Sequence, residues 1–473
     1  MVFTSSVFLG VFLPVLLAVY FLANRMARPY VLLVFSILFY AWGEPSAVVV
    51  MIALMVVNYV IGRGIAAAAR RTDGADGVRA LPGLLLALGV VIDLWALIGY
   101  KYLGFLVENL LPVLKLCGAT VPVPKIALPI GISFYVFQII SYIVDVYRKE
   151  VAVQRNPFKF MLYVSLFPQL IAGPIVRYST IAEDIENRKA DFGNIVAGLR
   201  RFALGLGKKV LIADTMATIV DGIFAAKVET IPCAWAWIGA IAYTLQIYFD
   251  FSGYSDMAIG LGRVFNFRFL ENFDHPYCAT SVQEFWRRWH ISLSTWFRDY
   301  LYIPLGGNRK GKVRTYCNMF TVFLLCGVWH GAAWNFVVWG VYHGVGIVVE
   351  RAGLRNLVAR LPKPVANLYL MLFVIVGWVL FRAPDLAYAW GYLGNMFGGA
   401  EAAFRSFTPS HEFVALDKLL LMAIGIVVSY PVFEPIARRT PEALRILVGM
   451  LFFAFVFVLA ITSAYSPFIY FRF

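Results

Sequence analysis

Long apolar runs recur along almost the whole chain and restrict what it can fold into. Runs such as 7–23, 84–97 and 446–461 are separated by short polar segments, so that no soluble domain is left over. Because lipid offers no hydrogen bonds to the backbone, apolar segments of this length are expected to be membrane helices. The sequence therefore predicts an all-α polytopic membrane protein, a single integral-membrane domain over residues 1–473 with about 11–13 transmembrane or re-entrant helices.

The composition supports this fold class. Hydrophobic residues make up 61% of the chain and charged residues only 14%, whereas soluble domains have about 25% charged residues. The formal net charge is +14, but the basic residues are scattered among short loops and helix ends, a pattern typical of contact with anionic membrane lipid rather than nucleic acid. The five cysteines have no CxxC spacing and no nearby paired histidines, so neither a disulfide framework nor a metal site is predicted.

Basic residues also indicate how the chain is oriented in the membrane. They follow the first apolar run at Arg25 and Arg28 and the third at Arg63 and Arg70, whereas the turn at 43–46 after the second run has none. Since Lys and Arg are enriched in cytoplasmic loops, the N-terminus is expected outside the cytoplasm.

Polar residues concentrate in the middle of the chain. Residues 167–174 interrupt an apolar run with two prolines and a glycine, which predicts a broken, re-entrant or cavity-lining segment. Asp250, Ser252 and Asp256 occur in an otherwise apolar span, where carboxylates are costly unless they are paired or hydrated. Two interpretations stay open: these side chains face an aqueous cavity, or the two carboxylates only hydrogen-bond helix ends.

An amphipathic helix is predicted from Ser281 to Pro304. Its aromatic and aliphatic residues recur at helical spacing and form one stripe, while arginines lie opposite. Ser281 and Glu284 have the spacing of a capping box, and the proline stands just beyond the far end. His290 falls at the edge of the apolar stripe, so we expect it between the buried and the hydrated face of this helix.

Three of the five histidines lie in aromatic, apolar sequence: His290, His330 and His343. A titratable ring at membrane depth carries a desolvation cost, which makes it a candidate functional residue. A single histidine among aromatic residues is more often a structural hydrogen-bonding residue, and spacing alone leaves that alternative open. For His343 we expect a structural or cavity-lining role.

Motifs spread over nearly the whole chain resemble those of the membrane-bound O-acyltransferases, and within that family the bacterial branch that acetylates exported polysaccharides. The motifs are residues 1–8, 131–135, 167–174, 248–256, 285–290, 302–308, 329–331 and 467–473. The resemblance implies a multi-pass O-acyltransferase of the bacterial inner membrane whose helices surround a central funnel. It also implies the substrates, since the acetyl group would come from cytosolic acetyl-CoA and go to an alginate-like exported polysaccharide.

By this resemblance His330 corresponds to the family's catalytic histidine and His290 to its second polar active-site residue. A neutral imidazole can remove the proton of a hydroxyl near neutral pH, so His330 is expected to act as general base. His290 is expected to orient the acceptor or to stabilise the developing oxyanion. A covalent acyl-histidine is the less favoured alternative. The other candidates for binding substrate are Asp250, Ser252, Asp256, Arg287, Arg288, Asn308, Lys310, Arg314 and Trp329.

Basic residues in and after the predicted helix are expected to attract the phosphates of CoA, because guanidinium and ammonium groups pair well with phosphate. They are Arg287, Arg288, Arg298, Arg309, Lys310, Lys312 and Arg314. Anchoring of helix ends in the membrane is an equal alternative. Acetyl-CoA is expected as a co-substrate, with no tightly bound cofactor and no metal.

The resemblance also implies a partner on the outer side of the membrane. The expected acceptor is an extracytoplasmic serine-esterase-like acetyltransferase or a carrier protein. Alternative reactions within the family transfer D-alanine to teichoic acid, or acetate to peptidoglycan or cellulose. An alternative of another class is a transporter or channel for an acyl group, in which the histidines relay protons.

Overall fold

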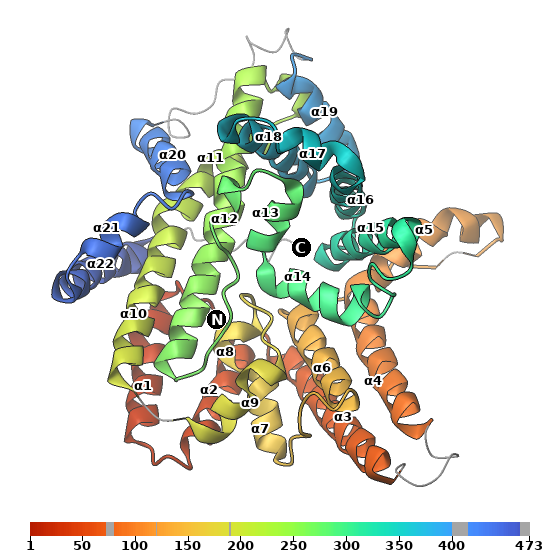
Figure 1. The fold of residues 1–473 in the computed structure, drawn as a ribbon, viewed down its shortest axis with the longest axis vertical. Helices are drawn as coiled ribbons and strands as arrows, with labels where there is room; N and C mark the ends of the chain where they lie inside the picture. The colour runs from red at the N-terminus through yellow and green to blue at the C-terminus, as the bar shows by residue number, and fades with distance from the viewer. Residues whose placement is uncertain (72–79, 120, 189–190, 400–414, 464–473) are drawn as a thin grey trace. The chain divides into compact units, whose positions relative to one another are not determined.

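A computed structural model describes residues 1–71, 80–119, 121–188, 191–399 and 415–463 (Figure 1). Every regular element in these ranges is a helix, so the predicted all-α fold class is confirmed. The last of the motifs, residues 467–473, lies outside the described residues.

The chain divides into two compact units. One contains Met1–Leu199 with Ala258–Leu270, and the other contains Arg200–Met257 with Glu271–Phe473. Helices α10 (Phe192–Gly207) and α12 (Cys233–Val264) contribute residues to both units. The single domain over residues 1–473 stays a prediction.

The first unit is built around α3 (Pro45–Arg71), α4 (Leu81–Leu97) and α6 (Ile132–Tyr147), which pack against one another (Figure 1). The break predicted in segment 167–174 is present, because α8 covers only Phe167–Leu170 and the following residues leave the helix. The other elements of this unit are η1 (Phe8–Phe12), α1 (Leu13–Leu22), α2 (Arg28–Gly43), η3 (Ile98–Tyr102), α5 (Leu103–Leu116), α7 (Pro157–Ser165) and α9 (Tyr178–Asn187).

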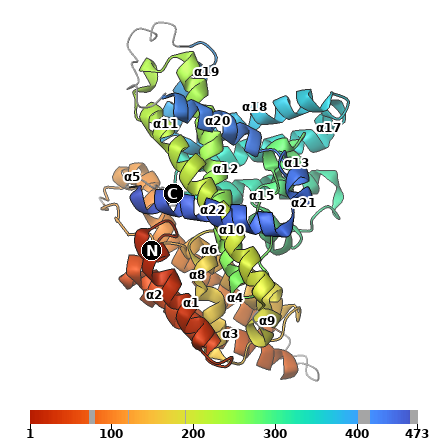
Figure 2. The same ribbon diagram turned by 90° about the vertical axis from the view of Figure 1, so that its left-hand side faces the viewer.

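The second unit carries the three histidines singled out from the sequence. Helix α15 (Gly311–His330) packs closely on α16 (Trp334–Val349). The closeness is clear at Gly327, where an added Cβ would lie only 2.3 Å from the carbonyl oxygen of Phe336. No larger residue fits at that crossing without moving one of the two helices. Helix α20 (Leu416–Val428) lies against α11 (Asp214–Phe224) (Figure 1; Figure 2).

The second unit contains further helical elements besides α11, α15, α16 and α20. They are η4 (Lys208–Ala213), η5 (Val228–Thr230), η6 (Pro276–Cys278), α13 (Val282–Arg288), α14 (Ile291–Phe297), η7 (Arg298–Tyr302), η8 (Glu350–Leu354), α17 (Arg355–Val358), α18 (Lys363–Arg382), α19 (Leu386–Met396), α21 (Glu434–Arg439) and α22 (Glu442–Thr462).

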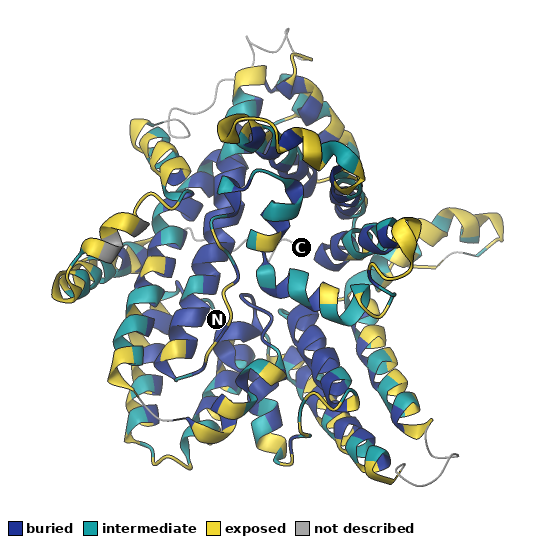
Figure 3. Ribbon diagram, in the orientation of Figure 1, coloured by how far each residue is buried: buried dark blue, intermediate teal, exposed yellow. Residues whose placement is uncertain are grey.

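Four helical segments in the described ranges are long and apolar enough to cross a membrane: Pro45–Arg71, Leu81–Leu116, Lys363–Arg382 and Glu442–Thr462. Shorter apolar helices cover Phe8–Leu22, Arg28–Gly43 and Ile132–Tyr147. Figure 3 shows α12 buried along most of its length, whereas α22 exposes most of its apolar side chains, as expected for a helix in lipid. The chain is an integral membrane protein; the number of about 11–13 passages and the central funnel stay predictions.

Candidate active site

His290 marks a break in the helix predicted from Ser281 to Pro304. The structure has two short helices there, α13 (Val282–Arg288) and α14 (Ile291–Phe297), so the prediction of one continuous helix is wrong. The backbone of His290 is left-handed, with φ 45° and ψ 52°. Few residues other than glycine adopt this conformation, which ends one helix and lets the next begin in a new direction.

Asn272 replaces the helical hydrogen bonds that are lost at this break. Its main-chain carbonyl accepts from the N–H of Ile291 at 2.9 Å, and its side-chain Oδ1 accepts from the N–H and the hydroxyl of Ser292 at 3.2 and 2.8 Å. Its Nδ2 donates to the hydroxyl of Ser255 in α12 at 3.0 Å. Asn272 is completely buried, and these bonds satisfy the first N–H groups of α14. No sequence motif marks Asn272 as part of the site.

The side chain of His290 is completely buried, so its predicted position between a buried and a hydrated face is wrong. That position assumed a continuous helix, and the left-handed turn takes residue 290 off the stripe. The Nδ1 atom lies 3.2 Å from Oδ1 of Asn272, and the ring packs edge-on against Phe251 at 4.6 Å between centroids. Helix α12 therefore supports His290 directly and through Ser255 and Asn272.

His330 is the last residue of α15 and is also buried, with 8% of its surface exposed. Its ring packs edge-on against Trp329 at 5.0 Å and against Trp339 and Phe381 at 5.1 Å each. The indole of Trp329 lies 6.2 Å from the His290 ring as well. The structure thus brings the two predicted catalytic histidines into contact with the same tryptophan.

His343 belongs to the same group of rings. The indole N–H of Trp286 donates to its Nδ1 at 3.3 Å, and its ring lies 4.7 Å from Trp339, which also contacts His330. We call this group the histidine–tryptophan cluster. Its members are His290, His330, His343, Trp286, Trp329 and Trp339.

The start of α13 is held by a buried carboxylate. Oε1 of Glu350 accepts from the N–H of Val282 at 2.7 Å, and Oε2 accepts from the N–H of Gln283 at 3.0 Å. The hydroxyl of Ser281 accepts from the N–H of Glu284 at 3.1 Å, which confirms the first half of the predicted capping box. Negative charge is favourable at a helix N-terminus, so Glu350 both caps α13 and fixes its position.

The carboxylates of α12 are paired with lysines. Asp250 lies 2.8 Å from Nζ of Lys209, which also lies 2.7 Å from Asp214, and these three side chains are buried. Asp256 lies 2.7 Å from Nζ of Lys208. Pairing lowers the cost of burying these charges, and the alternative in which both carboxylates only bond helix ends does not describe the structure.

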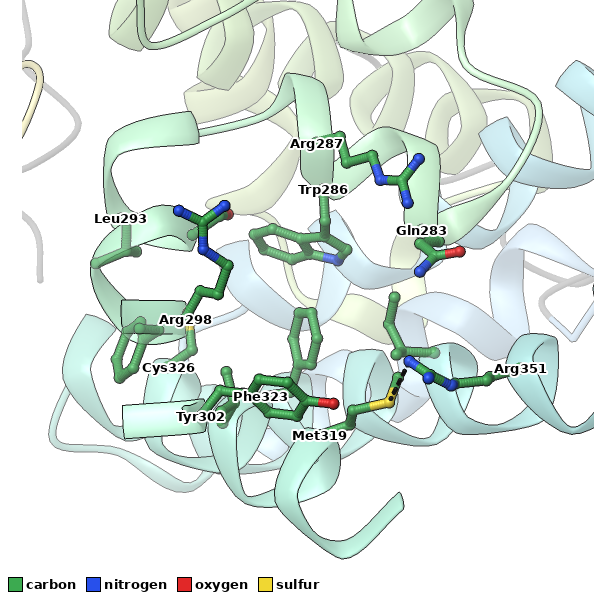
Figure 4. A pocket seen from close by; sticks show the side chains of 14 residues that line it. Gln283, Trp286, Arg287, Leu293, Arg298, Tyr302, Met319, Phe323, Cys326 and Arg351 are labelled. Atoms are coloured by element: carbon green, nitrogen blue, oxygen red, sulfur yellow. Dashed lines mark hydrogen bonds between the residues drawn. The ribbon is translucent and has the colours of Figure 1, made fainter. Parts of the chain in front are cut away.

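A pocket of about 250 Å³ lies among α13, α14, α15 and α16. Its wall is mostly apolar, and the exposed residues Arg287, Arg298 and Arg351 also line it. Figure 4 shows their guanidinium groups around the Trp286 indole and the Phe323 ring. Trp286 links the pocket to the histidine–tryptophan cluster, since its N–H bonds His343; neither His290 nor His330 is among the lining residues in this part of the chain.

The structure separates two neighbouring arginines that were both predicted to bind phosphate. Arg287 lines the pocket, whereas Arg288 pairs with Glu284 and Asp274 at 3.1 Å each. Arg351, which no sequence motif marks, lies in η8 just after the end of α16 and lines the same pocket.

The other predicted substrate-binding residues are spread over the second unit. Ser252 is buried in α12, and Trp329 lies in the histidine–tryptophan cluster. Asn308, Lys310 and Arg314 are exposed around the start of α15 and are not among the residues that line the described pocket. Their role in binding substrate, like that of the α12 carboxylates, stays a prediction.

In this integral membrane protein, the buried histidines and the neighbouring pocket with its arginines provide groups for acid–base chemistry. Comparison with known proteins identifies the family to which it belongs. Residues 132–389 match the model of the membrane-bound O-acyltransferase family. The chain is 42% identical to the probable alginate O-acetylase AlgI of Pseudomonas putida over the full length of both proteins. It is 46% identical to the protein of the same name from Pseudomonas aeruginosa, over 84% of this chain and 75% of that protein. It is 36% identical to the peptidoglycan O-acetyltransferase of Helicobacter pylori, over 84% of this chain and 80% of that protein.

The chain therefore belongs to the membrane-bound O-acyltransferase family, as its motifs predicted, and is an O-acyltransferase. The region that matches the family model contains the whole histidine–tryptophan cluster and every residue that lines the pocket.

Proposed function

We propose that this enzyme moves an acetyl group from cytosolic acetyl-CoA across the bacterial inner membrane, for O-acetylation of an exported, alginate-like polysaccharide. The observation that carries the proposal is the connection between the cationic pocket and the two buried histidines, through Trp286 and the rest of the histidine–tryptophan cluster. The relatives from Pseudomonas, which are named as probable alginate O-acetylases, support this choice of polysaccharide.

The pocket suits one part of the donor. A volume of about 250 Å³ is smaller than the roughly 300–1,000 Å³ of pockets that enclose drug-sized ligands, so it takes only a portion of CoA. The exposed guanidinium groups of Arg287 and Arg351 suit the phosphates, whereas that of Arg298 is paired with Asp299 at 2.6 Å. The apolar wall suits the less polar part of the molecule, next to the thioester.

The transfer requires a base near the acceptor. The acceptor hydroxyl gives its proton to an imidazole while its oxygen attacks the thioester carbonyl; the C–S bond breaks, and the CoA sulfur takes up the proton. We assign this proton transfer to the pair His290 and His330, which share the contact with Trp329. The family resemblance gives His330 the role of general base.

The two histidines are buried, so we propose that the acetyl group reaches a polysaccharide outside the cytoplasm through a partner. The partner is an extracytoplasmic serine-esterase-like acetyltransferase or a carrier protein. Co-purification of a serine-esterase-like protein supports polysaccharide acetylation, whereas a small acidic carrier points to transfer of D-alanine instead.

The purified protein in lipid nanodiscs, supplied with labelled acetyl-CoA and the co-purifying partner, tests this function. We expect His330→Ala to lower the rate of acetyl transfer by about 100-fold or more, the usual contribution of general base catalysis. Arg360→Gln is the control, because Arg360 is exposed and does not line the pocket. Unchanged transfer by His330→Ala removes this residue as the base; no transfer by the intact protein with any acceptor, together with acetyl uptake into vesicles, favours the transporter.

A further inference from the structure

We propose that Asn272 is a positioning residue that fixes the tautomer of His290, so that Nε2 of this ring accepts a hydrogen bond from the acceptor hydroxyl in acetyl transfer. The inference rests on the proposed transfer reaction and adds to it the tautomer of one ring and the residue that sets it. Asn272 lies in the loop between α12 and α13, outside every motif that marked the site in the sequence.

The orientation of the Asn272 amide is set by the backbone N–H of Ser292, which can only donate a hydrogen bond. The backbone N–H of Ser292 lies 3.2 Å from the same side-chain atom that faces Nδ1 of His290. That atom therefore has to be the carbonyl oxygen and not the amide nitrogen. The amide nitrogen at the other side then donates to the hydroxyl of Ser255 at 3.0 Å.

This orientation decides the tautomer of His290. An amide oxygen only accepts, so Nδ1 of His290 has to carry a hydrogen. In the neutral ring the second nitrogen, Nε2, then has a free lone pair. Nε2 is buried, and among the residues described by the structure no donor bonds it. A buried acceptor without a donor calls for an explanation, and a missing ligand is the first one to test.

The ligand that fits Nε2 is an alcohol. A hydroxyl donates a hydrogen bond to this lone pair, and the aromatic surroundings from Phe251 and Trp329 suit a neutral partner. An oxyanion does not fit, because a neutral Nε2 without hydrogen has nothing to donate. Of the two roles that the family resemblance implies for His290, stabilising the oxyanion is thus disfavoured and orienting the acceptor hydroxyl is favoured, while His330 keeps the role of general base.

A second buried histidine, His343, allows a direct comparison because its neighbour Trp286 favours the other tautomer. The indole N–H of Trp286 can only donate, and it lies 3.3 Å from Nδ1 of His343. In His343 the lone pair is therefore on Nδ1 and the hydrogen on Nε2, the reverse of His290. Both rings are buried in the same unit, so one spectrum compares the two tautomers.

Solid-state NMR of the protein in bilayers, with ¹⁵N-labelled histidine, tests the tautomers independently of any measurement of acetyl transfer. The signals are assigned by their loss in His290→Gln and His343→Gln. We expect an unprotonated Nε2 for His290 and an unprotonated Nδ1 for His343. An unprotonated Nδ1 at His290 overturns the proposal, whatever the activity of the protein.

Steady-state kinetics of acetyl transfer test whether the tautomer of His290 affects catalysis. We expect Asn272→Leu to lower kcat by about 100-fold, with KM for acetyl-CoA changed by less than about threefold, because Asn272 positions His290 and does not line the pocket proposed for CoA. Asn272→Asp keeps an acceptor for Nδ1 and should recover kcat to within about tenfold of the native enzyme. Asn395→Ala, which removes another buried amide bonded to the carbonyl of Val228, is the control for the loss of a structural asparagine.

The outcomes separate the inference from the proposed function. Native kcat in a folded Asn272→Leu variant overturns the role of Asn272, while acetyl transfer itself still stands. Absence of transfer by the native protein overturns the proposed function, and the NMR result then stands alone. If Asn272→Leu does not fold, the spectrum of the native protein still decides the tautomer.

Discussion

Replacing Arg287 with glutamine removes one guanidinium group from the pocket and keeps a polar side chain. Because Arg287 is exposed, its attraction for a phosphate is screened by water, and we use about 1 kcal/mol, the upper end for exposed ion pairs. A buried charge-assisted bond would be worth about 1.5–3 kcal/mol. Since about 1.4 kcal/mol corresponds to tenfold, we expect KM for acetyl-CoA to rise about fivefold. The value of kcat should not change, because the reacting atoms are untouched.

The neighbouring residue is the matched control. Arg288→Gln removes the same charge from the same helix, but its guanidinium group is engaged with Glu284 and Asp274. We expect its KM to stay within about twofold of the native value, and the effect of Arg287→Gln to shrink as salt rises from about 0.05 to 0.5 M. Steady-state kinetics at several salt concentrations measure both. Equal KM values for the two variants at low salt would refute the placement of the CoA phosphates at this pocket.

Three further predictions concern the packing that supports the site, and thermal unfolding in detergent checks each of them. Lys209→Met removes the buried positive charge that pairs with both Asp214 and Asp250 and should lower stability by about 3–5 kcal/mol, whereas changing both aspartates to asparagine as well should restore most of the loss. Gly327→Ala places a methyl group 2.3 Å from a carbonyl oxygen of α16 and should cost about 1–3 kcal/mol, while Gly394→Ala, which meets no atom within 4 Å, should be neutral. Glu350→Ala removes the acceptor for two N–H groups of α13 and should cost about 1–2 kcal/mol. Native stability of any variant expected to be destabilised would contradict the contact concerned.

The helical membrane fold could be predicted from the sequence because it depends on local information. An apolar run of sufficient length has to form a helix in lipid, whatever lies elsewhere in the chain. The break at His290 depends instead on Asn272, 18 residues away, whose carbonyl and amide oxygens replace the helical bonds. Periodicity detects which residues share a face of a helix, but it does not detect a hydrogen-bond partner from another segment. Segment 281–304 was therefore predicted to be one helix.

The same limit explains which parts of the site were missed. The motifs identified His290, His330 and Trp329, because these residues stand in distinctive local sequence. They did not distinguish Arg287 from Arg288, since successive residues of a helix point about 100° apart and only the surrounding elements decide which one meets a pocket. They also showed that a buried Asp250 needs a partner, without showing that Lys209 supplies it.

The contacts that orient the histidines also hold the helices together. Asn272 both starts α14 and fixes the tautomer of His290, and Trp286 both lines the pocket and bonds His343. A substitution at either position therefore changes a helix boundary or a pocket wall together with a ring nitrogen. Rate measurements alone cannot separate these effects, because a misplaced ring and a wrong tautomer both lower kcat. The protonation of each ring nitrogen therefore has to be observed directly. Because opposite tautomers are inferred for His290 and His343, a single spectrum can confirm or contradict the inference.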